Sequence, residues 1–360
     1  MIVNLVLAFF TALLLVMIAM PSLIKVAKLK HLVDEPGDER KLHSRSIPTL
    51  GGIMIFAGTI FAYSLLFPSK DSWMMGNNYD PLSALNEFKY LIASMFILFF
   101  LGLKDDIIGV APVKKLYVHA LVGFILVILA DIRITSFWGL FNVYDLPYWL
   151  SIVMSLFTYI VTVNAINLID GVDGLAGGIG LIASSTFGFW FYSTGDLPLS
   201  LLAISMAGAL TGFLIFNFQP AKIFMGDAGS LILGMVMYVL AMKLIEFPPN
   251  RMIGIATHVS KPVLAMAILC YPLADTLRVF IVRIASGKSP FLADKNHVHH
   301  KLLSFGWSHR KVSIVLYLVT LFFIMLTFAM PDDTPNISLI VVCGLAILAS
   351  FAVFWIPSKK

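Results

Sequence analysis

Apolar residues run along this chain in long unbroken stretches, separated by shorter polar segments. A helix that crosses the hydrocarbon core of a bilayer needs about 20 predominantly apolar residues. Eleven stretches approach or reach that length, at 2–21, 49–67, 90–103, 116–130, 147–163, 178–194, 199–216, 230–247, 262–281, 312–330 and 338–356. The pattern predicts an all-α polytopic membrane protein, a bundle of about eleven transmembrane helices. No internal repeat or low-complexity linker interrupts it, so we expect a single integral membrane domain over 1–360.

The composition supports this assignment. Hydrophobic residues make up 59% of the chain and charged residues 12%, against about 25% charged residues in an average soluble domain. These values exclude a disordered chain, a secreted disulfide scaffold and an ordinary soluble enzyme. Cys270 and Cys343 both fall inside apolar stretches, so we expect buried thiols and no disulfide. The net charge of +5 is spread along the chain and gives no indication of nucleic-acid binding.

The distribution of basic residues predicts the orientation in the membrane. The loops that contain 18 of the 25 Lys and Arg are 22–48, 104–115, 164–177, 217–229 and 282–311, with the tail 357–360. The intervening loops at 68–89, 131–146, 195–198, 248–261 and 331–337 contain only five. Since Lys and Arg accumulate in cytoplasmic loops, the N-terminus should lie outside and the C-terminus in the cytoplasm of a cell (inner) membrane protein. The stretch 2–21 could be a signal peptide, but the basic residues follow it, which favours a retained helix.

Four polar clusters from distant parts of the chain fall on the predicted cytoplasmic side. They are Asp105–Asp106, the segment Asn164–Leu175 with Asn164, Asn167, Asp170 and Asp173, the residue Asp227 between two glycines, and His297-Val-His299-His300. If the helices pack as a bundle, these clusters can converge on one cleft. We therefore place the active site on the five loops at 22–48, 104–115, 164–177, 217–229 and 282–311.

Each cluster also has a plain structural interpretation. Adjacent aspartates at a helix end can simply be solvated. The segment Asn164–Leu175 can be a turn, because Asn, Asp and Gly favour turns, although residues 164, 167 and 170 would form one polar stripe on a helix. Asp227 can be the N-cap of the eighth span. The histidines could suggest zinc, but both cysteines lie in spans, and a phosphate-binding loop fits the neighbouring lysines better.

Carboxylate and amide oxygens beside basic side chains indicate a particular chemistry. Mg²⁺ binds through one or two carboxylates together with substrate phosphates, and cationic groups neutralise a diphosphate. Phosphoryl transfer at a metal site depends mainly on positioning and charge neutralisation. The chain contains neither a Walker A loop nor a G-x-G-x-x-G motif, so a P-loop nucleotide site is not predicted.

The motifs, taken in order, resemble the polyprenyl-phosphate N-acetylhexosamine-1-phosphate transferases of glycosyltransferase family 4. The segments that carry the resemblance are Val33–Pro36, Arg40–His43, Pro48–Gly52, Asp105–Asp106 with Lys115, Asn164–Leu175, Asn217 with Lys222–Ser230, and Arg283, Gly287, Ser289–Phe291, Asp294 and His297–His300. Eleven spans and the His-x-His-His spacing are similar to the bacterial undecaprenyl-phosphate N-acetylglucosamine-1-phosphate transferases. The muramoyl-pentapeptide branch has ten spans and three consecutive histidines.

The resemblance implies a reaction and its partners. An oxygen of undecaprenyl phosphate attacks the sugar-side phosphorus of UDP-N-acetylglucosamine in the bilayer surface, and UMP leaves. The product, undecaprenyl-diphospho-N-acetylglucosamine, opens a cell-envelope polysaccharide pathway. Mg²⁺ is the implied cofactor, with Mn²⁺ as a substitute, and a homodimer is implied as well. Another UDP-sugar donor, such as UDP-N-acetylmuramoyl-pentapeptide, and a secondary transporter are the alternatives.

The resemblance also assigns roles to individual residues. Asn167 and Asp227 are expected to bind the metal ion, and Asp105, Asp106 and Asp227 to be catalytic. Asp105 and Asp106 would position or deprotonate the lipid phosphate or support metal-bound waters, while a covalent aspartyl intermediate is the rival mechanism. The residues expected to bind substrates are Asp34, His43, Lys115, Asn164, Asp170, Asp173, Arg283, His297, His299 and His300.

Overall fold

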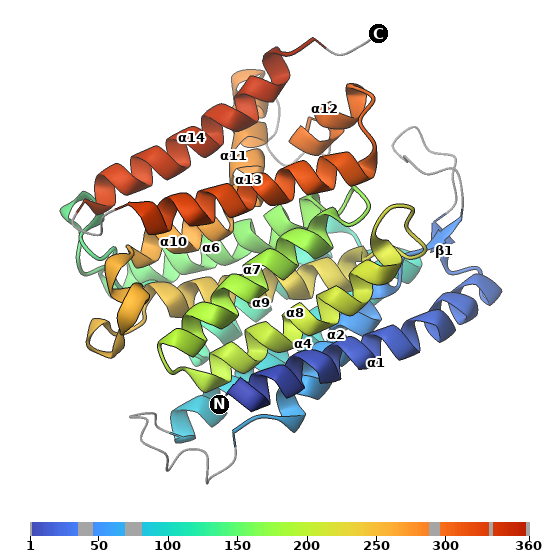
Figure 1. Cartoon of the computed structure of the whole chain (residues 1–360), viewed down its shortest axis with the longest axis horizontal. Coiled ribbons are helices and arrows are strands. Elements are labelled where there is room, and N and C mark those ends of the chain that lie inside the picture. The colour runs from blue at the N-terminus through green and yellow to red at the C-terminus, as the bar shows by residue number, and fades with distance from the viewer. Residues whose placement is uncertain (1, 35–45, 69–80, 288–295, 331–333, 358–360) are drawn as a thin grey trace.

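The computed structural model describes residues 2–34, 46–68, 81–287, 296–330 and 334–357 (Figure 1). Its α-helices are α1 (Ile2–Leu29), α2 (Gly51–Leu65), α4 (Pro81–Ile108), α5 (Pro112–Phe124), α6 (Tyr148–Leu168), α7 (Leu175–Ser193), α8 (Leu197–Asn217), α9 (Gly226–Ile245), α10 (Lys261–Ile268), α11 (Cys270–Ala285), α12 (Val298–Ser304), α13 (His309–Ala329) and α14 (Pro335–Trp355). A π-helical turn, Ile125–Leu129, continues α5. Short 3₁₀ turns occupy Leu140–Asn142, Pro249–Arg251 and Gly254–His258. Two short strands, β1 (Val33–Asp34) and β2 (Ile47–Pro48), pair antiparallel.

All eleven predicted stretches fall on helices, so the prediction of an all-α membrane bundle is confirmed. Among the described residues, eight helices are long and apolar enough to cross a membrane, and the bent pair α10 and α11 would make a ninth. The predicted span 262–281 is therefore wrong as one continuous helix, because the two halves meet at 78°. Pro272 lies in the first turn of α11, where its ring conflicts with the carbonyl of Ile268 and breaks the helix.

Helix α9 occupies the centre of the bundle. Among the 18 most apolar consecutive residues of α9, 94% are buried. The corresponding share is 22% in α1 and 22% in α14. A helix that is apolar on every side must be surrounded by other helices or by lipid, and α9 packs against α2, α4, α6, α7 and α10. The exposed apolar side chains of α1 and α14 are those of helices that face lipid.

Glycines allow two neighbouring helices to touch the backbone of α9. A Cβ atom on Gly52 of α2 would lie 2.1 Å from the backbone nitrogen of Gly229, and one on Gly102 of α4 would lie 2.4 Å from the Cα of Ala228. Small residues permit this approach between membrane helices. Both contacts involve the first turn of α9, so the C-terminal end of α4 is held beside the N-terminus of α9.

The segment before α9 is fastened to the start of α2 by backbone hydrogen bonds. The Phe224 nitrogen donates to the Pro48 carbonyl, and the nitrogens of Gly51 and Gly52 donate to the carbonyls of Phe224 and Met225. In apolar surroundings such groups must find partners within the protein. The end of β2, the start of α2 and the N-terminus of α9 consequently form one unit.

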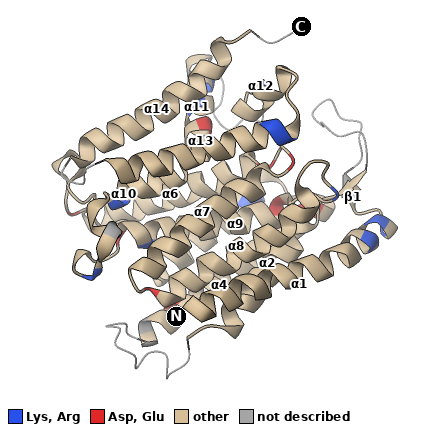
Figure 2. Cartoon of the chain, in the orientation of Figure 1, with Lys and Arg blue, Asp and Glu red and all other residues tan. Residues whose placement is uncertain are grey.

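The two chain termini lie at opposite ends of the bundle in Figure 1. Figure 2 shows that most of the helical ribbon carries neither acidic nor basic residues. The polar residues that do enter the bundle are therefore conspicuous, and those on α4, α5, α6 and α9 meet at one of its ends.

Replacing Gly52 by alanine tests the contact between α2 and α9. The added methyl group meets backbone atoms, which cannot move aside, so the variant should lose about 1–3 kcal/mol of stability. The measurement is the unfolding temperature in detergent. Gly344→Ala in α14 is the matched control, because nothing lies within 4 Å of its Cβ position. Equal unfolding temperatures for the two variants would contradict the proposed close contact.

Candidate active site

The N-terminus of α9 is capped by a side chain from another helix. Both carboxylate oxygens of Asp106 accept backbone hydrogen bonds, from the nitrogen of Asp227 at 2.8 Å and from that of Ala228 at 3.1 Å. The first N–H groups of a helix lack partners within it, and a negative charge there is stabilised by the helix dipole. Asp227 is not the N-cap, since Met225 occupies that position and Asp227 lies in the first turn.

Gly226 makes this capping arrangement possible. Its φ of +72° lies in the left-handed region that glycine adopts most easily. A Cβ atom at this position would lie 2.2 Å from the Thr49 carbonyl oxygen and 2.7 Å from Oδ2 of Asp106. The glycine before Asp227 is therefore required by both backbone conformation and space.

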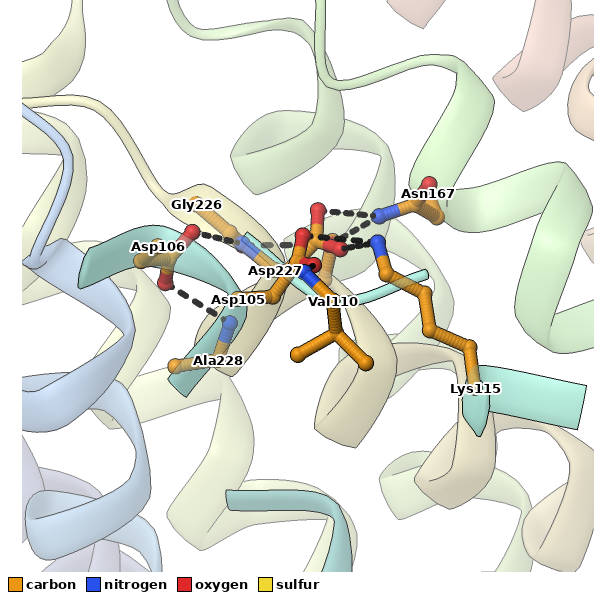
Figure 3. A network of polar contacts seen from close by, with 9 residues as sticks. Asp105, Asp106, Val110, Lys115, Asn167, Gly226, Asp227 and Ala228 are labelled. Atoms are coloured by element: carbon orange, nitrogen blue, oxygen red, sulfur yellow. Dashed lines mark hydrogen bonds and ion pairs between the residues drawn. The ribbon is translucent and has the colours of Figure 1, made fainter. Parts of the chain in front are cut away.

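Lys115 of α5 joins two of the predicted catalytic carboxylates. Its Nζ atom donates to Oδ2 of Asp105 at 2.6 Å and to Oδ2 of Asp227 at 2.7 Å (Figure 3). The other oxygen of Asp105 accepts the backbone N–H of Val110 at 2.7 Å. Two like charges this close require a cation between them, and here the ammonium group serves. The predicted convergence of the Asp105–Asp106 cluster with Asp227 is observed.

Asn167 orients Asp227 from the opposite side. Its Nδ2 donates to Oδ1 of Asp227 at 3.0 Å and to Oγ of Ser230 at 2.8 Å. Ser230 in turn donates to the carbonyl of Gly226 at 3.0 Å. Ser230 was not among the predicted site residues, although its position three residues after Asp227 puts it on the same face of α9. The N–H groups of the side-chain amide donate to Asp227 and Ser230, so Oδ1 of Asn167 is the atom that could bind a metal ion.

Asp170 adjoins this network from the turn that follows α6. Its carboxyl group lies near the Gly226 backbone and the carboxylates of Asp227 and Asp106. Burial, together with these negative neighbours, raises the pKa of Asp170 well above its ordinary value. Its neutral form is thereby favoured, which limits the repulsion among the acids.

Other residues of the Asn164–Leu175 segment have structural partners. Asn164 is exposed and its Nδ2 donates to the Ile160 carbonyl of its own helix. Asp173 accepts from the Ala221 nitrogen at 3.1 Å and lies 3.2 Å from Nδ1 of His309. Asp173 thus ties the turn to α13. Helix α6 continues to Leu168 and a turn follows it. The helical interpretation of this segment therefore holds for its first part and the turn interpretation for the rest.

Two predicted substrate-binding residues, Asp34 and His43, belong to the first loop. Asp34 is in β1 and pairs with Ile47 in the backbone register, and the structure describes nothing of its side chain. His43 lies outside the described residues. Both assignments stay predictions.

The three histidines form a second cluster, at the start of α12. The rings of His299 and His300 have centroids 4.3 Å apart, and Nδ1 of His299 lies 3.3 Å from the Tyr271 hydroxyl. A Cβ atom on Gly171 would lie 3.2 Å from Nε2 of His299, so this ring adjoins the turn that holds Asp170. Burial lowers the pKa of His299 to about 3, and the ring is therefore a neutral hydrogen-bonding group rather than a cation.

Two charged residues of α11 support the histidine cluster and were missed by the sequence analysis as site residues. Oδ2 of Asp275 lies 2.8 Å from Nδ1 of His297, and Oδ1 of Asp275 lies 3.1 Å from a guanidinium nitrogen of Arg278. Both fall inside the predicted span 262–281, and an ionisable residue within a span is itself a signal of function. Arg283, on the same helix, is buried.

The donor atoms near Asp227 fit a magnesium ion. No group of three or more His, Cys, Asp or Glu arranged to hold a metal occurs among the residues that the structure describes. Mg²⁺ does not need one, because it retains waters and uses one or two carboxylates with substrate phosphates. Asp105 and Asp227 already converge on a single cation, the Lys115 ammonium.

An apolar cavity of about 520 Å³ lies elsewhere, between α11, α12, α13 and α14. Its walls include Tyr271, Val298 and Phe323 and none of the carboxylates described above. None of the described residues that line it is charged, so it has no cation to neutralise a diphosphate. The carboxylate network, with Lys115, is therefore the candidate site.

Replacing Asp106 by alanine tests its role as the cap of α9. Two backbone N–H groups lose their acceptor, and each unsatisfied buried group costs about 1–3 kcal/mol. We expect a clearly lower unfolding temperature in detergent. Asp145→Ala, at an exposed position in the loop between α5 and α6, should leave it unchanged. Unaltered stability of the Asp106 variant would show that the cap is not needed.

The comparisons with known proteins agree with this arrangement. The family described as glycosyl transferase family 4 matches residues 88–245, which include Asp105, Asp106 and Asp227. A probable undecaprenyl-phosphate N-acetylglucosaminyl 1-phosphate transferase of Bacillus subtilis (strain 168) is 30% identical over 350 residues, covering 94% of this chain and 88% of the relative. Undecaprenyl-phosphate alpha-N-acetylglucosaminyl 1-phosphate transferases of Yersinia pestis and Escherichia coli (strain K12) are 30% and 28% identical over 301 residues, covering 82% of this chain and 75% of each relative. The chain is a multi-pass membrane protein that belongs to glycosyl transferase family 4.

Proposed function

We propose that this protein transfers N-acetylglucosamine-1-phosphate from UDP-N-acetylglucosamine to undecaprenyl phosphate and releases UMP. The observation that carries the proposal is the convergence of Asp105, Asp227 and Lys115 at one end of a membrane bundle. The names of the relatives supply the two substrates. A water-soluble nucleotide sugar and a lipid phosphate can meet only at a membrane surface, and the site lies where the helices end.

The reaction is a displacement at phosphorus. An oxygen of the lipid phosphate forms a bond to the sugar-side phosphorus, and the bond from that phosphorus to the oxygen shared with UMP breaks. A phosphate monoester has a second pKa of about 6, so the nucleophile is largely dianionic at neutral pH. Strong base catalysis is unnecessary. Direct displacement is preferred over an aspartyl intermediate because the carboxylates of Asp105 and Asp227 already hold Lys115.

Asp227, together with Oδ1 of Asn167, would hold Mg²⁺, with Asp105 beside it. When bound, the ion would neutralise charge that develops on the transferred phosphoryl group. Lys115 contributes a second positive charge from α5 and is the group we assign to the lipid phosphate. Asp106 acts on the backbone of α9 and so positions Asp227.

The histidine cluster would contact the diphosphate from the other side. His299 adjoins the turn of Asp170, so the two substrate-binding predictions involve neighbouring elements. A neutral His299 can donate one hydrogen bond to a phosphate oxygen. The cationic contribution must come from other groups, such as Lys115.

We further propose eleven membrane crossings, with the N-terminus outside, the C-terminus in the cytoplasm and the site facing the cytoplasm of the inner membrane. The opposite placement of the two termini is compatible with an odd number of crossings (Figure 1). The excess of Lys and Arg in the loops on the site's side supports the orientation. A homodimer stays a prediction.

The central test is an assay of UMP release by the purified protein in detergent with undecaprenyl phosphate and UDP-N-acetylglucosamine. Asp227→Asn should lower turnover at least about 100-fold, since charge stabilisation at the transition state is lost. Removing divalent ions should stop turnover, and Mn²⁺ should restore it, because both ions prefer oxygen ligands.

Asp145→Asn is the matched control and should behave as the unaltered protein, because Asp145 precedes the start of α6 whereas Asn167 lies at the other end of that helix. Turnover with another UDP-sugar but not with UDP-N-acetylglucosamine would refute the donor assignment. Turnover that survives chelation would refute the metal.

The orientation can be tested with a membrane-impermeant maleimide on intact cells. Both native cysteines are first replaced by serine. Asp145→Cys should be labelled from outside, whereas Lys311→Cys, at the start of α13, should react only after lysis. Labelling of Lys311→Cys in intact cells would reverse the proposed topology.

A further inference from the structure

Asp275 of α11 makes three hydrogen bonds, two of them with the first residues of the histidine cluster and one with Arg278 of its own helix. Its Oδ2 lies 2.8 Å from Nδ1 of His297, and its Oδ1 accepts the backbone N–H of Val298 at 3.0 Å and a guanidinium N–H of Arg278 at 3.1 Å. The carboxylate is 1% exposed and the His297 side chain 5% exposed. A membrane helix thus reaches into the loop that carries the histidines.

Arg278 extends this connection to the last helix. Its guanidinium donates to the Asn296 carbonyl, and it lies 3.9 Å from the centre of the Phe354 ring of α14. A guanidinium over an aromatic face is stabilised by the charge distribution of the ring. Residues 296–298 are consequently held by Asp275 and Arg278 at three successive positions.

The arrangement requires a proton on Nδ1 of His297. Val298 and Arg278 both donate to Asp275, so they stabilise its ionised, acceptor-only form. A ring nitrogen facing that carboxylate must therefore be an N–H donor. Nδ1 of His297 is protonated, and Nε2 is the nitrogen left for another partner.

We propose that Asp275 is a positioning residue for His297: it binds Nδ1–H and so holds the ring where Nε2, as an N–H donor of the imidazolium, reaches an oxygen of the substrate diphosphate. This rests on the proposed function, in which the histidine cluster contacts the diphosphate. The His297 and His299 rings are stacked with an interplanar angle of 8° and centroids 5.5 Å apart, so fixing the first ring also restrains the second.

The test compares Asp275→Asn, His297→Gln and the double variant. Asparagine keeps an acceptor for Val298 but cannot hold an imidazole N–H as a carboxylate does. Loss of such a partner of a functional histidine typically costs about 10- to 100-fold, and we expect this fall in kcat/KM for UMP release. Asp275→Asn should have no further effect once His297 is replaced. Asp196→Asn is the control, a carboxylate of similar burial that caps α8.

If the two single-variant losses of kcat/KM multiplied in the double variant, the proposal would be overturned. Asp275 would then affect turnover independently of His297. An unchanged kcat/KM for Asp275→Asn would overturn it as well. If Asp275→Asn fails to fold because Arg278 is left as an unpaired buried charge, the variant that also carries Arg278→Gln replaces it.

A spectroscopic measurement separates this proposal from the proposed function. Protein with ¹⁵N-labelled histidine should show an Nδ1–H signal that disappears in His297→Gln and changes in Asp275→Asn. Persistence of the same signal in Asp275→Asn would refute the positioning role even if the protein releases UMP. Absence of UMP release from the unaltered protein, with the expected signals present, would refute the proposed function alone.

Discussion

The N-terminus of α9 imposes the constraint on which the rest of the site depends. Its first N–H groups have no partners within the helix, and a buried N–H group left unsatisfied costs about 1–3 kcal/mol. Asp106 accepts two of these N–H groups, and the next charge along the same helix, Asp227, needs a cation nearby. Because Asp105 and Asp106 are adjacent on α4, capping α9 with one of them brings the other to Lys115 and Asp227.

Three glycines allow the close helix packing that this capping arrangement needs. Gly52 and Gly102 let α2 and α4 reach the backbone of α9, and Gly226 turns the chain so that the cap fits. A larger side chain at Gly102 or Gly226 would push α4 away from α9 and separate the carboxylates, and one at Gly52 would push α2 away from α9. The geometry of the carboxylate network therefore depends on residues with no polar side chain of their own.

The same bundle holds two polar centres of different character. The carboxylate network carries opposing charges and is suited to a cation and phosphates. In the histidine cluster, His297 and His299 are buried and the low pKa of His299 keeps that ring neutral. The charged residues next to the cluster are Asp275 and Arg278 of α11. One centre supplies electrostatic stabilisation, and the other is suited to directional hydrogen bonds. The turn between α6 and α7 lies between them, since it contains both Asp170 and Gly171.

Much of the fold followed from the sequence, because a helix in lipid satisfies its own backbone and must be apolar over its whole length. That requirement is local, so the eleven stretches could be placed, and the ordered motifs indicated that Asp105, Asp227 and Lys115 belong together. The partners of each side chain were not local. Whether Asp106 or Asp227 caps α9, that Asp173 binds Ala221, and that Asp275 holds His297 were decided by contacts between segments far apart in the chain. Only the packed bundle brings those segments within hydrogen-bonding distance, and burial then makes each unpaired group too costly to leave.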